Sequence, residues 1–384
     1  MSRLNPRPPL WRLLLRPLRG LDPWLMLAVA LLLGLSAVIM HSAGLGYDGR
    51  MADHLRNMGL AVAVMFIVAQ VPPQQLQRLA VPAYAVGVAL LVAVLAFGIT
   101  RKGATRWLNV GVVIQPSEMM KIAMPLMLAW WFQRREGQLK ALDFGLATLL
   151  LALPTALIMK QPDLGTSLLV LAAGLYVIFF AGLSWWLILP ILTAGALGIG
   201  ALILTGDIIC QPGIEWPLLH EYQRHRVCTL LDPMSDPLGK GFHIIQGMIA
   251  IGSGGLAGKG YLQGTQAHLD FVPEHTTDFI FAAYAEEFGL LGSLGLLGAF
   301  AFLILRGLAI AHQAPTVFTR LLAGALSLSF FTYVFVNIGM VSGILPVVGV
   351  PLPFVSYGGT AMVTLGIAVG MLLAIARSRR MIQS

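Results

Sequence analysis

Residues 22–41 read DPWLMLAVALLLGLSAVIMH, and no charged side chain lies between the aspartate and the final histidine. A run of about 20 apolar residues is long enough for an α-helix to cross the hydrocarbon core of a bilayer. The rest of the chain has the same character, because 57% of its 384 residues are hydrophobic and 11% are charged. Soluble domains carry about 25% charged residues. The sequence therefore predicts an all-α polytopic membrane protein.

Similar apolar runs recur along the chain and predict about ten transmembrane helices. They lie near residues 22–41, 55–71, 80–98, 117–132, 142–159, 164–182, 185–205, 278–304, 317–342 and 358–376. An even number of spans places both termini on one side. We interpret residues 1–384 as a single membrane domain, with an N-terminal cytoplasmic segment 1–21 and a C-terminal cytoplasmic tail 377–384.

The positions of the basic residues predict which side is cytoplasmic. If both termini lie in the cytoplasm, 14 of the 25 lysines and arginines fall in cytoplasmic segments, as the positive-inside rule expects. The sequence contains no long basic stretch typical of a nucleic-acid surface. We therefore expect a membrane protein with both termini in the cytoplasm that binds no nucleic acid.

Three outer segments are rich in polar residues and glycine. They cover residues 100–115, about 206–277 and 343–359. The second segment is a large periplasmic loop between the seventh and eighth predicted helices. A connection of roughly 70 residues is far longer than an ordinary turn and indicates a functional element. We therefore expect the active face to be periplasmic.

Glu118 and Lys121 are charged residues at the start of the fourth predicted span. On a helix they are i,i+3 neighbours and can neutralise each other. Charged side chains within a membrane are costly and commonly functional. The alternative is a structural ion pair that fixes helix packing.

Asp278 lies at the end of the large loop, in the segment FVPEHTTDFIF of residues 271–281. A carboxylate at a helix start stays ionised near neutral pH and can accept a proton. Thr276 or Thr277 can cap the same helix. Residue chemistry leaves two alternatives open for Asp278, a general base and a capping acid. Asp163 likewise lies at the start of a helix, in QPDLGT (161–166). A functional carboxylate and a simple helix-start signal are equal alternatives for this residue.

Residues 252–260, GSGGLAGKG, resemble a phosphate-binding P-loop. Ser253 replaces the first glycine of that motif, and Gly260 replaces the Ser or Thr that holds magnesium. The backbone amides of this segment can line an anion site, or the segment can be a tight packing turn. Both alternatives stay open.

Two further pairs of residues lie in or near the large loop. Glu286 and Glu287 follow Asp278 in apolar surroundings and need partners, for which Arg224 and Arg226 are candidates. Cys210 and Cys228 are the two cysteines of the chain. A disulfide is allowed if the loop faces an oxidising periplasm, and an accidental pair of thiols is the alternative.

Several long motifs give the chain a family likeness. The run NIGMVSGILPVVGVPLPFVSYGG covers residues 337–359, and residues 222–260 begin YQRHRVCTLLDP. QPSE occupies residues 115–118, QPDLGT follows at 161–166, and the loop ends in Asp278. In this order the motifs resemble the SEDS family of shape, elongation, division and sporulation proteins. The VVGVPLP portion is similar to the RodA-like elongation branch.

The resemblance implies a peptidoglycan glycosyltransferase of the bacterial inner membrane, which polymerises lipid II during cell-wall elongation and works with a class B penicillin-binding protein. Other membrane proteins of the elongation complex are expected as partners. The resemblance carries the family's essential loop aspartate onto Asp278, and its membrane pair onto Glu118 and Lys121. Ser356 and Tyr357, in the signature run, are candidate substrate-binding or supporting residues. One departure is that His275 precedes two threonines, where the family reads His-Thr-Asp.

Polymerisation of lipid II needs a base for the acceptor hydroxyl and a cation for the leaving diphosphate. Asp278 is the expected base. The candidate cations are Arg101, Arg106, Arg224 and Arg226. A divalent metal ion is the alternative, with ligands that the sequence leaves unknown. A lipid-open groove is expected for the polyprenyl tail.

Two other functions compete with this interpretation. A lipid II flippase would also place ionisable groups within the membrane, but it would not need a large loop that ends in a carboxylate. A non-enzymatic scaffold for a penicillin-binding protein would need the polar loop residues for folding alone.

Overall fold

The structure is a computed structural model that describes residues 20–101, 104–109, 111, 113–211, 221–236, 239–269 and 271–383. A helix occupies each of the ten apolar runs. These helices are α2 (Pro23–Ala43), α3 (Arg50–Val68), α4 (Pro73–Phe97), α5 (Pro116–Gln133), α6 (Ala141–Lys160), α7 (Leu164–Phe180), α8 (Trp185–Ile209), α12 (Ile280–His312), α13 (Val317–Val341) and α14 (Gly359–Gln383). Within the described ranges, seven helices are long and apolar enough to cross a membrane. The predicted all-α polytopic fold is confirmed.

The outer segments contain secondary structure that the apolar pattern did not predict. The large loop contains α9 (Glu221–Leu231), a 3-10 turn η2 (Pro233–Ser235), α10 (Lys240–Ser253) and α11 (Thr265–His268). The segment before α5 forms the antiparallel strands β1 (Ile99–Arg101), β2 (Ala104–Asn109) and β3 (Val113–Ile114), in the order β1-β2-β3. These elements order the backbone of the outer face.

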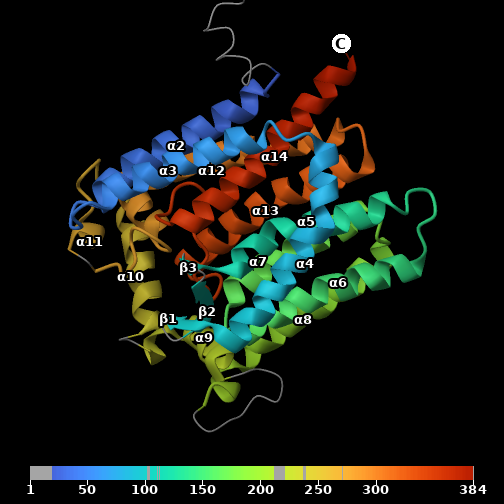
Figure 1. The fold of residues 1–384 in the computed structure, drawn as a ribbon. Coiled ribbons are helices and arrows are strands. Elements are labelled where there is room, and N and C mark those ends of the chain that lie inside the picture. The colour runs from blue at the N-terminus through green and yellow to red at the C-terminus, as the bar shows by residue number, and fades with distance from the viewer. Residues whose placement is uncertain are drawn as a thin grey trace, which may run out of the picture.

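Helix α13 is the centre of the bundle. It packs against α12, α7 and α5, and 72% of its most apolar stretch is buried. Helices α2 and α3 lie along one side of the bundle, where α2 contacts α12 and α3 contacts α14, and α6 and α8 lie toward the opposite side (Figure 1). Residues on α13 are therefore fixed by neighbours from both halves of the chain.

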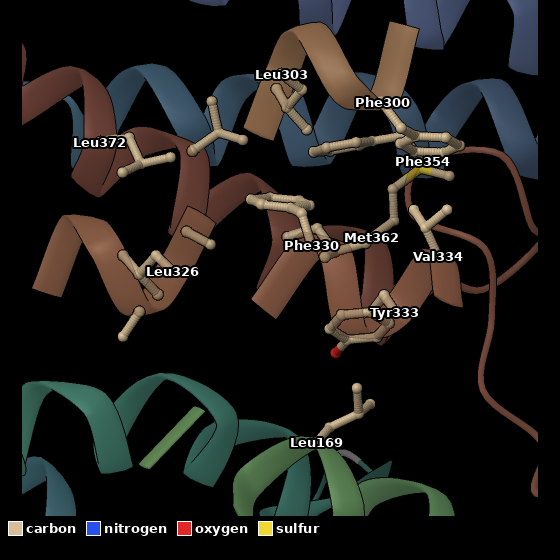
Figure 2. Close-up of a cluster of buried hydrophobic side chains, with 14 of the residues drawn as sticks. Leu169, Phe300, Leu303, Leu326, Phe330, Tyr333, Val334, Phe354, Met362 and Leu372 are labelled. Atoms are coloured by element: carbon tan, nitrogen blue, oxygen red, sulfur yellow. The ribbon is translucent and has the colours of Figure 1, made fainter. Parts of the chain in front are cut away.

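The buried core holds the signature loop, residues 343–359, in place. Figure 2 shows Phe300 and Leu303 of α12 with Phe330 of α13 and Phe354 of this loop. The rings of Phe330 and Phe354 are stacked with their centroids 6.1 Å apart. Phe354 is 3% exposed, and its backbone has a φ of 61°, a region that non-glycine residues rarely adopt. Burial of the ring therefore anchors a bent loop to the bundle.

Helix α12 is broken at Gly289, which has a φ of 63° and a ψ of −160°. The glycine-rich segment 252–260 supplies the backbone partners that this break removes. Four hydrogen bonds join the two segments, from Lys259 N to Glu286 O, Gly260 N to Glu287 O, Leu290 N to Gly255 O and Leu291 N to Leu256 O. A break at membrane depth is tolerated where protein groups satisfy the backbone in this way. The structure supports the packing turn, because the amides of Lys259 and Gly260 bond to carbonyls of α12.

Candidate functional site

Asp278 lies at the outer end of α12, two residues before the helix begins at Ile280. Phe279 occupies the N-cap position, and its side chain makes no capping hydrogen bond. The N-cap position therefore falls on Phe279, and not on Thr276, Thr277 or Asp278, which the sequence offered as caps. Asp278 is half-buried. Its position suits a carboxylate that meets a substrate at the membrane surface.

The signature loop passes directly beside the Asp278 carboxylate. A Cβ atom built on Gly349 would lie 3.3 Å from Asp278 Oδ2, and Gly349 has a φ of +74°. Asn337, on α13, donates from Nδ2 to the carbonyls of Asp278 at 2.9 Å and Val350 at 2.7 Å. One buried amide thus joins the Asp278 turn to the signature loop. Sequence reasoning quoted Asn337 within the signature run and missed its role.

Ser356 and Tyr357 also meet this turn. Ser356 Oγ donates to the Thr277 carbonyl at 2.6 Å, and Tyr357 N donates to the Thr276 carbonyl at 2.9 Å. Both contacts fix the backbone directly before Asp278. The two residues therefore hold the backbone that carries the carboxylate.

Glu118 and Lys121 form an ion pair in the first turns of α5. Lys121 Nζ lies 2.6 Å from Glu118 Oε1, and the side chains are 6% and 13% exposed. The same Nζ lies 5.2 Å from the ring centroid of Tyr333 on α13. Tyr333 and Asn337 are i,i+4 neighbours, so they lie about 6 Å apart along the helix axis. Adjacent turns of α13 thus contact the ion pair and the Asp278 turn.

The predicted arginines lie in different places. Arg226 Nη1 donates to the Val347 carbonyl of the signature loop at 2.9 Å. Arg224 Nη2 donates to the Gln211 carbonyl at 2.7 Å, and it lines a cavity of about 290 Å³ beside Cys210 and Cys228. The structure therefore brings Arg226, and not Arg224, to the loop beside Asp278.

Arg106 holds the start of α7. It donates to the Pro162 carbonyl at 2.6 Å and lies 3.5 Å from Asp163 Oδ1. The sequence placed Asp163 in the first turn of a helix. It is instead the N-cap of α7, one residue before that turn, and its side chain accepts a hydrogen bond from Thr166 N. It also accepts from Gln115 Nε2 at 3.0 Å, beside the start of α5. The side chain of Arg101 lies outside the described residues.

Arg50, at the start of α3, is a cation of the site that sequence reasoning did not select. Its guanidinium lies 3.9 Å above the Tyr47 ring and 5.2 Å from the Tyr357 ring. It also donates to Thr276 Oγ1. In the sequence, Arg50 could be recognised as an arginine of an outer loop that lies three residues after Tyr47. Its partner Tyr357 is 307 residues further along the chain, so local spacing could not identify the contact.

Glu286 and Glu287 do not pair with Arg224 or Arg226, so that prediction is wrong. Glu286 accepts from Lys259 Nζ at 2.5 Å and from Gln266 N at 3.0 Å. Glu287 accepts from Ser42 Oγ. Both carboxylates are buried, at 0% and 2% exposure. They fasten the glycine-rich segment and the end of α2 to the outer half of α12, beneath the Asp278 turn.

The two cysteines form a disulfide between the end of α8 and α9. A disulfide is therefore the alternative that the structure supports. It ties the outer end of α8 to the large loop. No group of three or more His, Cys, Asp or Glu side chains that could hold a metal ion occurs in the described part of the chain.

An apolar groove of about 590 Å³ runs down the bundle from the Glu118 end of α5. Polar residues line its outer end, and mostly aliphatic side chains line the remainder. The lining residues come from α3, α4, α5, α14 and the segment just before α5, and include Asn57, Leu76, Leu79, Gln115, Glu118, Leu126, Thr360 and Met371. This groove has the shape and polarity to hold a lipid chain whose polar head lies at the outer face.

Comparisons with known proteins agree with this geometry. Residues 23–381 match the FtsW/RodA/SpoVE family of cell cycle proteins. The peptidoglycan glycosyltransferase MrdB of Escherichia coli is 50% identical over 364 residues, which cover 94% of this chain and 95% of the relative. The probable peptidoglycan glycosyltransferase FtsW of Geobacter metallireducens is 34% identical, over 82% of each chain.

Solved structures are similar along nearly the whole chain. A chain from a peptidoglycan synthase complex that coordinates polymerisation and crosslinking has a TM-score of 0.77 and 33% identity, over 94% of this chain and 98% of its own length. The rod shape determining protein RodA of Thermus thermophilus has a TM-score of 0.68 and 28% identity, over 94% and 97% of the two chains. The motifs, the fold and these matches together place the chain in the FtsW/RodA/SpoVE family of cell cycle proteins.

Proposed function

We propose that Asp278 is the general base of this chain, which is a peptidoglycan glycosyltransferase and a multi-pass protein of the inner membrane. The observation that carries the proposal is the placement of the Asp278 carboxylate beside the signature loop. The Asn337, Ser356 and Tyr357 contacts fix the backbone on either side of it. A base must be held in a fixed geometry to be effective.

In the reaction, the Asp278 carboxylate takes the proton of the acceptor sugar's 4-hydroxyl as that oxygen attacks the anomeric carbon of the donor. The bond between this carbon and the diphosphate oxygen breaks, and the lipid diphosphate leaves with the bonding electrons. A carboxylate is a weak base, so it acts as the bond forms and the hydroxyl becomes acidic. The direct test is incubation of the purified chain with lipid II, with and without its partner, followed by detection of polymer.

Two parts of the structure match the polyprenyl tail and the diphosphate of the substrate. The apolar groove along α3, α4, α5 and α14 holds the polyprenyl tail. Arg50 and Arg226 are the described arginines tied to the Asp278 turn and the signature loop, and they offer positive charge to the diphosphate. The diphosphate then lies at the outer end of the groove, near the base.

We propose that a divalent cation reaches this site together with the diphosphate. Magnesium is commonly held by substrate phosphates and one or two carboxylates, and the described residues contain no cluster of metal ligands. Chelation of divalent cations with EDTA is therefore expected to slow polymerisation, and added magnesium should restore the rate. An unchanged rate in EDTA would contradict a metal requirement.

We propose that the active face is periplasmic and that both termini lie in the cytoplasm. Leu139 is 40% exposed in the connection between α5 and α6. Met234 is 71% exposed in the turn η2 of the large loop. In intact cells, an impermeant thiol reagent is expected to label Met234→Cys and not Leu139→Cys. Labelling of Leu139→Cys alone would reverse the orientation and overturn the proposed function.

We propose that the partner is a single-pass class B penicillin-binding protein, and that its transmembrane helix packs near the last three spans. A groove of about 380 Å³ between α12 and α13 is the candidate surface. Phe331 and Phe335 line it, are stacked 5.7 Å apart, and are 48% and 53% exposed. Its aromatic lining suits the side chains of one apolar helix.

Replacing both phenylalanines with alanine is expected to lower the yield of co-purified partner at least about tenfold, because aromatic anchors dominate many interfaces. The matched control is the alanine pair at Leu149 and Leu153, which are exposed on α6. Equal loss of partner in the control would show that the effect is not specific to this groove. Full retention in the phenylalanine variant would place the partner elsewhere.

A further inference from the structure

Helix α8 is attached to the described part of the bundle mainly through α9. Among the residues of α8 whose exposure is described, Gly206 alone is buried. A Cβ atom built on Gly206 would lie 2.9 Å from Leu231 Cδ1 of α9, so the two helices meet closely at this point. The disulfide between Cys210 and Cys228 joins the same two segments covalently. The outer end of α8 therefore depends on α9 for its position.

Helix α9 also contacts the signature loop. Cys228 lies two residues after Arg226, so the two side chains leave α9 about 200° apart. Cys228 is bonded toward α8, and Arg226 Nη1 donates to the Val347 carbonyl at 2.9 Å. Val347 lies two residues before Gly349, whose backbone passes beside the Asp278 carboxylate. A displacement of α9 therefore reaches the backbone next to the proposed base.

The disulfide is accessible from the outer face. Both cysteines are half-buried, and they line the cavity of about 290 Å³ together with Arg224, Thr229 and Asp236. Thiol–disulfide exchange needs a path by which an attacking thiolate reaches one of the two sulfur atoms. The cavity supplies this path.

We infer that the disulfide between Cys210 and Cys228 is a thiol-exchange site, and that its reduction by a dithiol slows polymerisation by releasing α9 from α8. The inference rests on the proposed role of Asp278 and on the proposed periplasmic face. A thiolate of the dithiol attacks one sulfur and forms a mixed disulfide, and the other sulfur leaves as a thiolate that takes a proton. The second thiol of the dithiol then displaces the first cysteine, which takes a proton in turn. Two electrons pass to the protein, and the dithiol becomes a disulfide.

Reduction leaves weaker contacts between α8 and α9 in the described part of the chain. One is the packing of Gly206 against Leu231, and another is the hydrogen bond from Arg224 Nη2 to the Gln211 carbonyl at 2.7 Å. Neither is covalent, and a hydrogen bond is lost when its partners separate by about an ångström. Arg226 then lies on a helix with more freedom, and the signature loop loses a fixed neighbour.

Access and coupling can be tested without any assay of polymerisation. The full chain in lipid nanodiscs is treated with dithiothreitol, trapped with N-ethylmaleimide and examined by mass spectrometry, both folded and after unfolding. We expect modification of both cysteines in the folded protein. We also expect faster hydrogen exchange in α9 and in residues 343–359 after reduction. A disulfide that is reduced only after unfolding, or exchange that reduction leaves unchanged, would overturn the inference.

The rate of polymerisation is the second measurement. The chain contains two cysteines, so a dithiol acts on this bond alone within it. Reduction should lower kcat about tenfold with KM little changed, because a small displacement near a catalytic group has effects of that size, and reoxidation should restore the rate. The double variant Cys210→Ser with Cys228→Ser should have the rate of the reduced protein and should not respond to dithiothreitol, which excludes an effect of the reagent on a co-purified partner. Equal rates of oxidised and reduced wild type would contradict the inference, even if the double variant failed to fold.

Arg226→Gln and Arg224→Gln are a matched pair on α9, because Arg226 contacts the signature loop and Arg224 contacts Gln211. Reduction should slow Arg224→Gln as it slows the wild type, and it should change the rate of Arg226→Gln little. Equal sensitivity of the two variants would rule out transmission through Arg226. If Asp278→Asn stayed active while reduction loosened residues 343–359 and slowed the wild type, the assignment of the base would fail and the exchange site would stand. An inactive Asp278→Asn with a wild-type rate that reduction leaves unchanged would give the opposite result.

Discussion

Replacing Asp278 with asparagine is expected to lower the rate of lipid II polymerisation at least about a hundredfold, the scale of a lost general base. Asparagine keeps the size of the side chain and one oxygen, but it cannot take a proton from the acceptor hydroxyl. The backbone contacts of Asn337, Ser356 and Tyr357 with this turn do not involve the carboxylate. We therefore expect Asp278→Asn to fold, insert and bind its partner normally.

Glu274→Gln is the control for this experiment. Glu274 is an exposed carboxylate of the same turn and accepts from Thr277 Oγ1 at 2.8 Å. Its loss should leave polymerisation close to the wild-type rate, measured as glycan polymer per unit time from purified protein. Near-normal polymerisation by Asp278→Asn would place the base elsewhere. A loss of equal size in both variants would point to the charge of the turn, and not to one base.

Breaking the ion pair of Glu118 and Lys121 is expected to have the largest effect on stability. Lys121→Met leaves a buried Glu118 without its cation, and removing one partner of a buried pair costs about 3–5 kcal/mol. A double variant that combines Glu118→Leu with Lys121→Met should recover most of the stability, since no charge is left unpaired. Thermal unfolding of detergent-purified protein measures both effects.

Asp53 and Arg56 supply the matched control on α3. They form an i,i+3 pair at 3.0 Å like that of α5, but their side chains are 44% and 75% exposed. Breaking an exposed pair changes stability little. The position of Lys121 beside Tyr333, one turn from Asn337, leads us to expect that the apolar double variant folds but polymerises poorly. Full polymerisation by that variant would show that the pair is structural.

The fold was largely predictable because its main determinant is local. Each of the ten apolar runs is long enough to require a helix in a bilayer, so composition within a short window indicates the element. The short sheet before α5 was not predictable from apolar runs, because its strands are brief and pair with neighbours in an outer segment. The glycine-rich segment was ambiguous for a related reason. Its amides could face an anion or a broken helix, and the packed structure shows that those of Lys259 and Gly260 bond to carbonyls of α12.

The candidate site was predictable in its residue types and not in its contacts. Asp278, Glu118 and Lys121 were identifiable because a charge beside or within an apolar run is costly and needs a reason. The partners of Glu286 and Glu287 could not be assigned from the sequence, because charge alone does not distinguish Lys259 from Arg224 or Arg226. Arg50 and Asn337 were missed, because their partners Thr276, Tyr357 and Asp278 are remote in sequence.

Hydropathy and motif order alone thus specify a helical membrane protein, its family likeness and the loop aspartate that we propose as the base. They do so because burial of apolar side chains in lipid depends on residue type, whatever the neighbours are. Tertiary structure decides which cations approach the signature loop, how Gly349 places backbone beside Asp278, and how α9 joins α8 to that loop. Hydrogen bonds and ion pairs act over a few ångströms and depend on direction. Their partners are therefore known only when the helices have packed.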